Sequence, residues 1–208
     1  MAVRVQVFAK APVAGEVKTR LIPRLGAAGA AKLQCGLIAC ALDTAFASGI
    51  GAVELWCAPA ADHPAFTPFA GRGAALCDQG PGDLGTRMLR ALRGAQIQGD
   101  AAVLIGSDCP ALTTQDLKVA ANALTAGMDA VIAPADDGGY VLIAARYARV
   151  ELFENIAWGS ELVIEQTRMR MVKLGWRWQE LPTRWDVDRP EDYDRLIREQ
   201  LIEQHAGA

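Results

Sequence analysis

Short apolar runs alternate along the chain with longer segments in which apolar residues recur at helical spacing. The short runs, rich in Val, Ile, Leu and Ala, predict strands at residues 3–9, 52–57, 74–77, 101–105, 129–133, 141–145 and 176–181. The periodic segments predict helices at residues 26–47, 83–96, 114–124, 161–172 and 190–204. Residues 60–73 follow neither pattern, which indicates a surface loop.

This alternation predicts an α/β fold, a three-layer α/β/α sandwich around a mostly parallel central sheet. The apolar runs are continuous rather than alternating, which is typical of strands covered on both faces. The chain contains no repeat, low-complexity tract or linker. We therefore expect one domain over residues 1–208.

Composition excludes several classes of protein. The net charge of −3 and the pI of about 5.4 argue against a nucleic-acid-binding surface. No uninterrupted apolar run reaches the roughly 20 residues of a membrane span, and we expect neither a span nor a signal peptide. Five cysteines without a C-x-x-C pair favour a reducing cytoplasm, and only two histidines are present.

The segment AKAPVAGEVKTRLIPRLG, residues 9–26, connects the first predicted strand to the first predicted helix. It lies where open α/β sheets bind ligands, beyond the carboxyl end of a strand. Lys10, Lys18, Arg20 and Arg24 supply positive charge for phosphate or carboxylate groups, and Gly15 lets the backbone bend toward a ligand. Neither a Walker A loop nor a G-x-G-x-x-G fingerprint is present. The pattern favours an anion-binding loop over an exposed basic connector.

Carboxylates follow later strands at the same edge of the sheet. Asp108 comes directly after Ser107, where a buried strand ends; a turn aspartate without function is the alternative. Asp186 and Asp188 are two residues apart, so an extended segment places them on one side, where they can bind one cation together with Asp108. Oxygen ligands favour Mg²⁺ or Mn²⁺.

Two features of these acidic segments have alternative explanations. Asp188 also fits the N-cap of the last helix, with Glu191 at the third helical position. Asp136 and Asp137 precede Gly138 and Gly139, and an Asp-Gly hairpin turn explains the glycines but not two carboxylates on the binding side. Trp176 and Trp178 are interpreted as core residues or as the edge of a homodimer.

Six ordered blocks together resemble the DUF2064 family. They are FAKAPVAGEVKTRL, GPGDLGTRM, LIGSDCPAL, APADDGGYVLIA, IAWGSELVIEQT and WDVDRPEDY. The family is placed among the GT-A-like nucleotide-diphospho-sugar transferases, and its members are often labelled radical-SAM/selenodomain-associated transferases. The first and last blocks are also similar to those of cofactor and sugar nucleotidyltransferases.

The resemblance implies roles for particular residues. Lys18 and Arg20 would contact nucleotide phosphates, and Asp108, Asp186 and Asp188 would hold Mg²⁺. The candidate residues for binding nucleotide or substrate are Lys10, Gly15, Lys18, Arg20, Gly82, Asp83, Gly85, Arg87, Ser107, Gly138, Gly139, Tyr140 and Trp158. Among them, Gly82 to Gly85 and Arg87 would lie near the nucleotide. The turn from Asp137 to Tyr140 and Trp158 would shape the acceptor side.

Two reactions fit these parts. In glycosyl transfer from a nucleotide-sugar donor to a small acceptor, Asp137 would be the general base, with Lys18, Arg20 and Asp108 as the other catalytic groups. In nucleotidyl transfer, a phosphate or carboxylate would attack a nucleoside triphosphate and release pyrophosphate. We predict the glycosyltransferase, with the nucleotidyltransferase as the alternative and a non-catalytic nucleotide-binding module as a third hypothesis.

Overall fold

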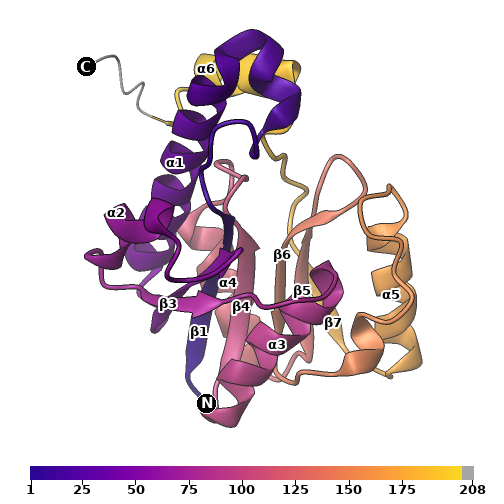
Figure 1. Cartoon of the computed structure of the whole chain (residues 1–208). Helices are drawn as coiled ribbons and strands as arrows, with labels where there is room; N and C mark the ends of the chain where they lie inside the picture. Colours follow the sequence, from indigo (N-terminus) through magenta and orange to yellow (C-terminus); the bar gives the residue numbers. More distant parts are fainter. Residues whose placement is uncertain (203–208) are drawn as a thin grey trace.

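Seven strands form one sheet in the computed structural model of the chain, which describes residues 1–202 (Figure 1). The strands are β1 (Val3–Lys10), β2 (Val53–Ala58), β3 (Ala75–Asp78), β4 (Ala101–Gly106), β5 (Ala130–Pro134), β6 (Tyr140–Ala145) and β7 (Trp178–Glu180). Their order in the sheet is β3-β2-β1-β4-β6-β5-β7. Every neighbouring pair is parallel except those of β6, which runs antiparallel to both β4 and β5. The predicted mostly parallel sheet is confirmed.

Helices cover both faces of this sheet and make three layers. On one face α1 (Ile22–Ser48) and α4 (Thr114–Thr125) pack on the sheet, together with the short α2 (Thr67–Ala70). On the other face lie α3 (Leu84–Ile97) and α5 (Val163–Lys173). The last helix, α6 (Pro190–Glu199), lies beside the amino-terminal part of α1 (Figure 1).

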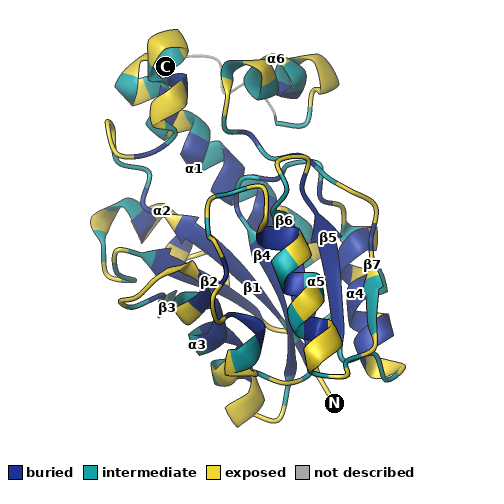
Figure 2. Cartoon of the chain, turned by 90° about the vertical axis from the view of Figure 1, so that its right-hand side faces the viewer, coloured by how far each residue is buried: buried dark blue, intermediate teal, exposed yellow. Residues whose placement is uncertain are grey.

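The central strands are apolar on both sides because helices cover both sides. In β1, Val5 and Val7 belong to the core under α1 and α4, whereas Phe8 belongs to the core under α3 and α5. In β4, Ile105 belongs to the core under α1 and α4, and Leu104 belongs to the core under α3 and α5. Figure 2 shows the strands as a buried layer between helices whose outer faces are exposed.

The first helix begins earlier than the sequence predicts. A short 3₁₀ turn (Thr19–Leu21) leads into α1, which continues through Gly26 although that residue has φ 70° and ψ 164°. Glycine reaches this backbone conformation at little cost, so the helix changes direction there instead of ending. The bend carries the amino-terminal turns of α1 toward α6. There Leu21, Leu37 and Leu196 share a small core with Trp185 and Val187.

Residues Thr19–Ser48 form one helix that is long and apolar enough, by length and composition only, to cross a membrane. One such helix is a weak indication, because core helices have the same composition. This helix packs on the sheet through residues such as Ile38 and Leu42.

The other differences concern the ends of elements and one loop. Residues 60–73, expected to be a surface loop, contain two short helices whose Phe66 and Phe69 are buried in the core, so that prediction is wrong. The last helix ends at Glu199, and Gln204 of the predicted helix lies outside the described residues. Trp176 and Trp178 are partly buried against the core under α3 and α5.

Candidate active site

A pocket of about 700 Å³ opens at the carboxyl ends of β1 and β4. Its walls come from segments far apart in the sequence: the loop after β1, the loop after β4, the start of α3, the β5–β6 turn, residues 158–160 and residues 186–188. The parallel order of β2, β1 and β4 brings these strand ends together. The position is the one at which open α/β sheets bind their ligands.

The loop after β1 supplies the positive charge at the mouth of the pocket. Lys10 Nζ donates a hydrogen bond to the Glu16 carbonyl oxygen at 2.7 Å, which closes the loop on itself. Gly15 has φ 87° and Lys18 has φ 46°, so the backbone turns twice through the left-handed region. As a result the Lys18 side chain points inward. It is only 8% exposed, and its Nζ lies 3.4 Å from Asp108 Oδ2.

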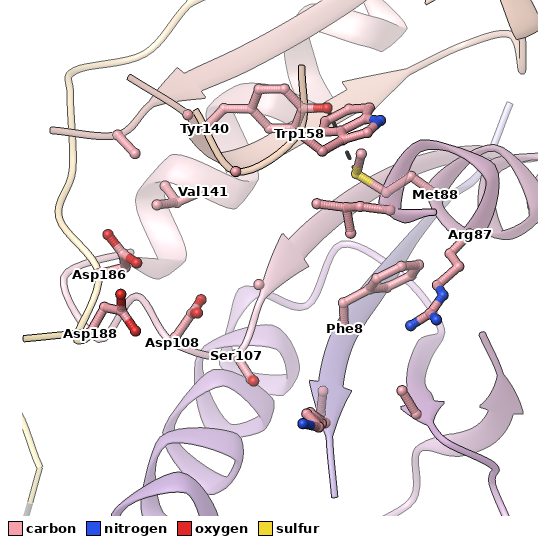
Figure 3. A pocket seen from close by; sticks show the side chains of 18 of the residues that line it. Phe8, Arg87, Met88, Ser107, Asp108, Tyr140, Val141, Trp158, Asp186 and Asp188 are labelled. Carbon is pink, nitrogen blue, oxygen red and sulfur yellow. Dashed lines mark hydrogen bonds between the residues drawn. The ribbon is translucent and has the colours of Figure 1, made fainter. Parts of the chain in front are cut away.

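Four aspartates line the pocket opposite this loop: Asp108, Asp137, Asp186 and Asp188. Burial and, to a smaller extent, the negative charges of Asp108 and Asp137 together raise the pKa of Asp186 to about 7, although the positive charge of Lys18 opposes them. The chain therefore accumulates negative charge at this end of the pocket. Figure 3 shows the carboxylates of Asp108, Asp186 and Asp188 close together.

An aromatic wall forms the other side of the pocket. Tyr140 and Trp158 meet edge to face, with their ring centroids 6.4 Å apart. The Tyr140 hydroxyl donates to Met88 Sδ at 3.7 Å, and burial raises the pKa of this phenol above its usual range. Phe8 of β1 and Arg87 of α3 complete this side (Figure 3). The pocket thus has a charged end and a largely apolar end.

The family model described as "Uncharacterized protein conserved in bacteria (DUF2064)" matches residues 41–160, more than half of the chain. The chain belongs to the DUF2064 family. A solved structure from Desulfovibrio desulfuricans G20, provisionally described as a nucleotide-diphospho-sugar transferase, is 31% identical with a TM-score of 0.88. The match covers 99% of this chain and 90% of that one. No curated protein matches by sequence.

Two solved structures with lower sequence identity share the fold of this DUF2064 protein. CMP:2-keto-3-deoxy-manno-octonic acid synthetase in complex with CTP is 10% identical with a TM-score of 0.61, over 96% of this chain and 98% of that one. Glucosyl-3-phosphoglycerate synthase from Mycobacterium tuberculosis, in complex with Mn²⁺, UDP and its product, is 14% identical with a TM-score of 0.53. That match covers 96% of this chain and 77% of the other. The chain therefore shares its fold with both of these proteins.

Most residues singled out from the sequence do meet at the pocket. The lining includes Lys10, Lys18, Arg87, Ser107, Asp108, Asp137, Gly139, Tyr140, Trp158, Asp186 and Asp188. Segments separated by more than 170 residues contribute to it, as the resemblance implied. Their substrate contacts stay a prediction.

The remaining predicted residues are not part of this lining. Arg20 is exposed and pairs with Asp188. The Asp83 carboxylate accepts the Thr86 N–H and caps α3, and these hydrogen bonds lower the pKa of Asp83. The glycines Gly15, Gly82, Gly85 and Gly138 shape the backbone. At Gly138, for example, a Cβ would lie 2.4 Å from the Glu161 carbonyl oxygen.

The prediction that Asp188 caps the last helix is wrong. Arg189 is the N-cap of α6, and Asp192 at the third helical position accepts the backbone N–H groups of Arg189 and Asp188. The helix begins at Pro190 as predicted, but its N-cap lies one residue later than Asp188, because Asp192 rather than Glu191 completes the capping box. The Asp188 carboxylate pairs with Arg20 instead.

The carboxylates suit a divalent cation in chemistry but are not gathered around one point. Within residues 1–202, no three acidic, histidine or cysteine side chains lie close enough together to form a metal site. Asp108 faces Lys18, and Asp188 faces Arg20. The charges of Asp108 and Asp137 nevertheless add to the effect of burial in raising the pKa of Asp186, and a divalent cation would offset that repulsion. All the donors are carboxylate oxygens, which Mg²⁺ and Mn²⁺ prefer.

Two pocket residues were missed from the sequence. Gln79 follows β3 and is buried, with its side-chain amide donating to the carbonyl oxygens of Ala9 and Trp56 at 3.1 and 2.9 Å. Gln34 of α1 is also buried, and its amide lies 3.4 Å from the Ser107 hydroxyl. A glutamine within the alanine-rich helix was the available signal, because a polar side chain on a core face needs a partner.

One contact in the aromatic wall gives a direct test. A Cβ on Gly85 would lie 2.7 Å from Trp158 Cζ2, so α3 and the indole approach each other only because residue 85 is glycine. We expect Gly85→Ala to destabilise the protein by about 1–3 kcal/mol through overpacking, measured by urea unfolding.

Gly94→Ala on the same helix is the matched control. Its Cβ would meet Trp56 at an ordinary 3.6 Å, and alanine favours the helix, so a gain of up to about 1 kcal/mol is expected. Equal effects of the two substitutions would contradict the close packing of Trp158.

A partly buried ion pair fixes the segment that carries Asp186. Arg184 Nη2 donates to Asp116 Oδ1 at 2.7 Å and Nε donates to Oδ2 at 3.2 Å, while Thr113 donates to the same carboxylate. The backbone of Arg184 pairs with Pro134 and Asp136, just before the turn that holds Asp137. Two residues beyond Trp185, the Val187 N–H donates to the Asp108 carbonyl oxygen at 2.9 Å. The ion pair and these backbone hydrogen bonds together connect the segments that carry Asp108, Asp137 and Asp186.

We expect Arg184→Lys to lower the free energy of unfolding by about 1–3 kcal/mol, because lysine cannot make the forked contact with Asp116. Urea unfolding measures the change. Arg149→Lys is the control: Arg149 forms a similar contact with Glu151, but both side chains are exposed, and an effect below about 1 kcal/mol is expected. A similar loss in both variants would count against a special role for the Asp116–Arg184 pair.

Proposed function

We propose that this DUF2064 protein is a glycosyltransferase that moves a sugar from a nucleoside-diphosphate sugar to a small acceptor. The observation that carries the proposal is the meeting of Lys18, Asp108, Asp137 and Asp186 in one pocket at the carboxyl edge of the sheet. A diphosphate needs positive charge and a cation-binding group, and an alcohol acceptor needs a base. This end of the pocket contains all three.

The roles follow from the positions of the side chains. Lys10 at the end of β1 and Lys18 in the loop that follows would stabilise the donor phosphates. The Asp137 carboxylate accepts the Gly139 N–H at 2.9 Å, which holds it at the pocket wall. It would take the proton from the acceptor hydroxyl as that oxygen bonds to the anomeric carbon. The bond from the anomeric carbon to the diphosphate breaks, and the nucleoside diphosphate leaves with the electron pair.

Asp108, Asp186 and Asp188 would hold Mg²⁺ or Mn²⁺, which neutralises charge on a diphosphate leaving group when it is bound. Binding would require Asp108 to turn from Lys18, and Asp188 from Arg20. Both carboxylates are about two-fifths exposed, so these rearrangements cost little compared with those of a buried pair.

The relatives support a transferase at this level. The 31% identical relative is provisionally described as a nucleotide-diphospho-sugar transferase and matches nearly the whole chain. Among the distant structures with the same fold, one is described with UDP and Mn²⁺ and another with CTP. These likenesses support a nucleotide-using reaction, and the choice of sugar transfer rests on Asp137.

Nucleotidyl transfer is the second candidate, and the loop after β1 favours it. The inward-pointing Lys18 and the nearby Lys10 suit the longer phosphate chain of a nucleoside triphosphate. In that reaction an ionised phosphate or carboxylate attacks the α-phosphorus and pyrophosphate leaves, so no base is required. A purely binding module would leave the four pocket aspartates without a role.

A binding and turnover screen tests the proposal. The protein is mixed with Mn²⁺ or Mg²⁺ and a series of nucleotide-sugars, nucleoside diphosphates and nucleoside triphosphates, and its thermal unfolding is followed. A ligand at about 100 times its Kd adds about 2.7 kcal/mol to stability. We expect one nucleotide-sugar to stabilise more than its bare diphosphate and to release that diphosphate slowly by hydrolysis. Stabilisation by triphosphates alone would favour nucleotidyl transfer, and no response at all would exclude both reactions.

A further inference from the structure

The cationic groups of the pocket lie in two separate places. Lys10 ends β1 and Lys18 belongs to the loop that follows, whereas Arg87 extends from the first turn of α3. In Figure 3 Arg87 lies across the pocket from Asp108, Asp186 and Asp188, with Phe8 and Met88 near it. Arg87 is therefore a second positively charged group of the pocket, on the side opposite these acidic residues.

Arg87 retains donors that the protein does not use. Its Nε donates to the Gly82 carbonyl oxygen at 2.9 Å, which holds the guanidinium at the pocket wall. Within residues 1–202 its two terminal nitrogens have no hydrogen-bond or ion-pair partner in the chain. Asp83 is the acidic group closest along the helix, and its carboxylate accepts the Thr86 N–H. The hydrogen bonds from Thr86 and, to a smaller extent, the charge of Arg87 lower the pKa of Asp83, but Asp83 forms no ion pair within 4.0 Å of Arg87.

The next arginine on the helix shows the contrast. Arg90 uses both terminal nitrogens on backbone carbonyl oxygens, those of Gln79 and Pro81, and so has a structural role. Arg87 has one such anchor and faces the pocket with the rest of its guanidinium. A half-buried guanidinium beside an apolar wall is a strong site for a phosphate or carboxylate, because its planar fork matches these groups.

We propose that the acceptor substrate carries an anionic group, a phosphate or a carboxylate, which Arg87 binds at the aromatic end of the pocket. The inference rests on the proposed function, since it names the class of the second substrate at the same site. The donor diphosphate meets Lys10, Lys18 and the carboxylates, so a second anion across the pocket belongs to the other reactant. Tyr140, Trp158 and Met88 cover the carbon skeleton between the two cationic parts of the pocket.

Binding measurements with a matched set of probes test this assignment. Glycerol 3-phosphate, glycerate and glycerol differ in the anionic group and are titrated calorimetrically into protein saturated with Mn²⁺ and the best-binding nucleoside diphosphate. The nucleotide occupies the lysine end, so anions that bind report on the other end. We expect at least one anionic probe to bind at least about tenfold more tightly than glycerol.

Three variants separate Arg87 from general effects. Arg87→Gln is expected to weaken the anionic probe about tenfold or more, while affinity for the nucleoside diphosphate changes less than about twofold. Arg87→Lys should restore part of the probe affinity. Arg93→Gln, on the exposed side of the same helix, should change neither.

The outcomes separate this inference from the proposed function. Nucleotide binding without preferential binding of any anionic probe overturns the acceptor assignment and leaves the proposed function standing. Loss of nucleotide affinity in Arg87→Gln overturns the assignment as well, because it places Arg87 in the donor site. A protein that binds no nucleoside diphosphate with Mn²⁺ contradicts the proposed function, and the acceptor assignment fails with it.

Discussion

Asp108→Asn is expected to lower turnover at least about 100-fold, whichever of the two transfer reactions the protein performs. Asp108 ends β4 in the pocket, lies 3.4 Å from Lys18 and raises the pKa of Asp186 through its charge. Asparagine keeps the size of the side chain and removes the charge. A cation-binding group is lost, while contacts between the nucleotide and the loop after β1 remain. Release of the nucleoside diphosphate or pyrophosphate measures the effect.

Folding must be separated from catalysis in this variant, because the substitution leaves the nearly buried Lys18 without its partner. We expect a loss of about 1–3 kcal/mol in unfolding free energy, and thermal unfolding with a metal-free nucleotide checks that the pocket persists. Asp136→Asn is the matched control: Asp136 lies next to Asp137, is exposed and pairs with Arg195 at 3.6 Å. Turnover should be unchanged there. Undiminished turnover in Asp108→Asn would remove Asp108 from the mechanism.

Asp186→Asn is expected to stabilise the metal-free protein at pH 8 and to have little effect near pH 4. Burial and the charges of Asp108 and Asp137 raise the pKa of Asp186 from 3.8 to about 7. Between these pH values the folded state binds a proton that the unfolded state has lost. The stability of the parent therefore falls as pH rises through this range and levels off above about 7. Asparagine resembles the neutral acid at every pH, so the variant lacks this decrease.

The difference in pKa corresponds to a gain on the order of 4 kcal/mol at pH 8. Urea unfolding of both proteins at pH 4, 6 and 8, with a chelator present, measures it. Asp136→Asn again serves as the control, because its exposed ion pair contributes less than about 1 kcal/mol at any pH. Parallel pH profiles for the parent and Asp186→Asn would show that Asp186 is an ordinary carboxyl group.

Much of the fold follows from local patterns. The strands β1 and β4 were predicted because their apolar runs are continuous, and the structure buries them between two helical layers. The N-terminus of α3 was located to within one residue, since Asp83 caps the helix. The Asp-Gly turn correctly indicated a hairpin, and β6 runs antiparallel to β5. In each case residues close in sequence decide the conformation.

Other features depend on residues far apart in the chain. The sequence suggested that Asp188 caps α6, but the capping box uses Asp192, and Asp188 pairs with Arg20. Residues 60–73 show neither helical nor strand periodicity, yet Phe66 and Phe69 are buried in the core. Local spacing cannot predict such contacts, because each partner lies on another element.

The sequence by itself determined the order of strands and helices, the strand ends that carry Lys18, Asp108 and Asp137, and the resemblance to the DUF2064 family. Only the tertiary structure decided that Lys18 faces Asp108, that Asp186 lies among other carboxylates, and that Arg87 stands apart with unused donors. The physical reason is that periodicity and turn chemistry act over a few residues. Burial and charge at the site arise from segments joined by the sheet, so they exist only after the chain has folded.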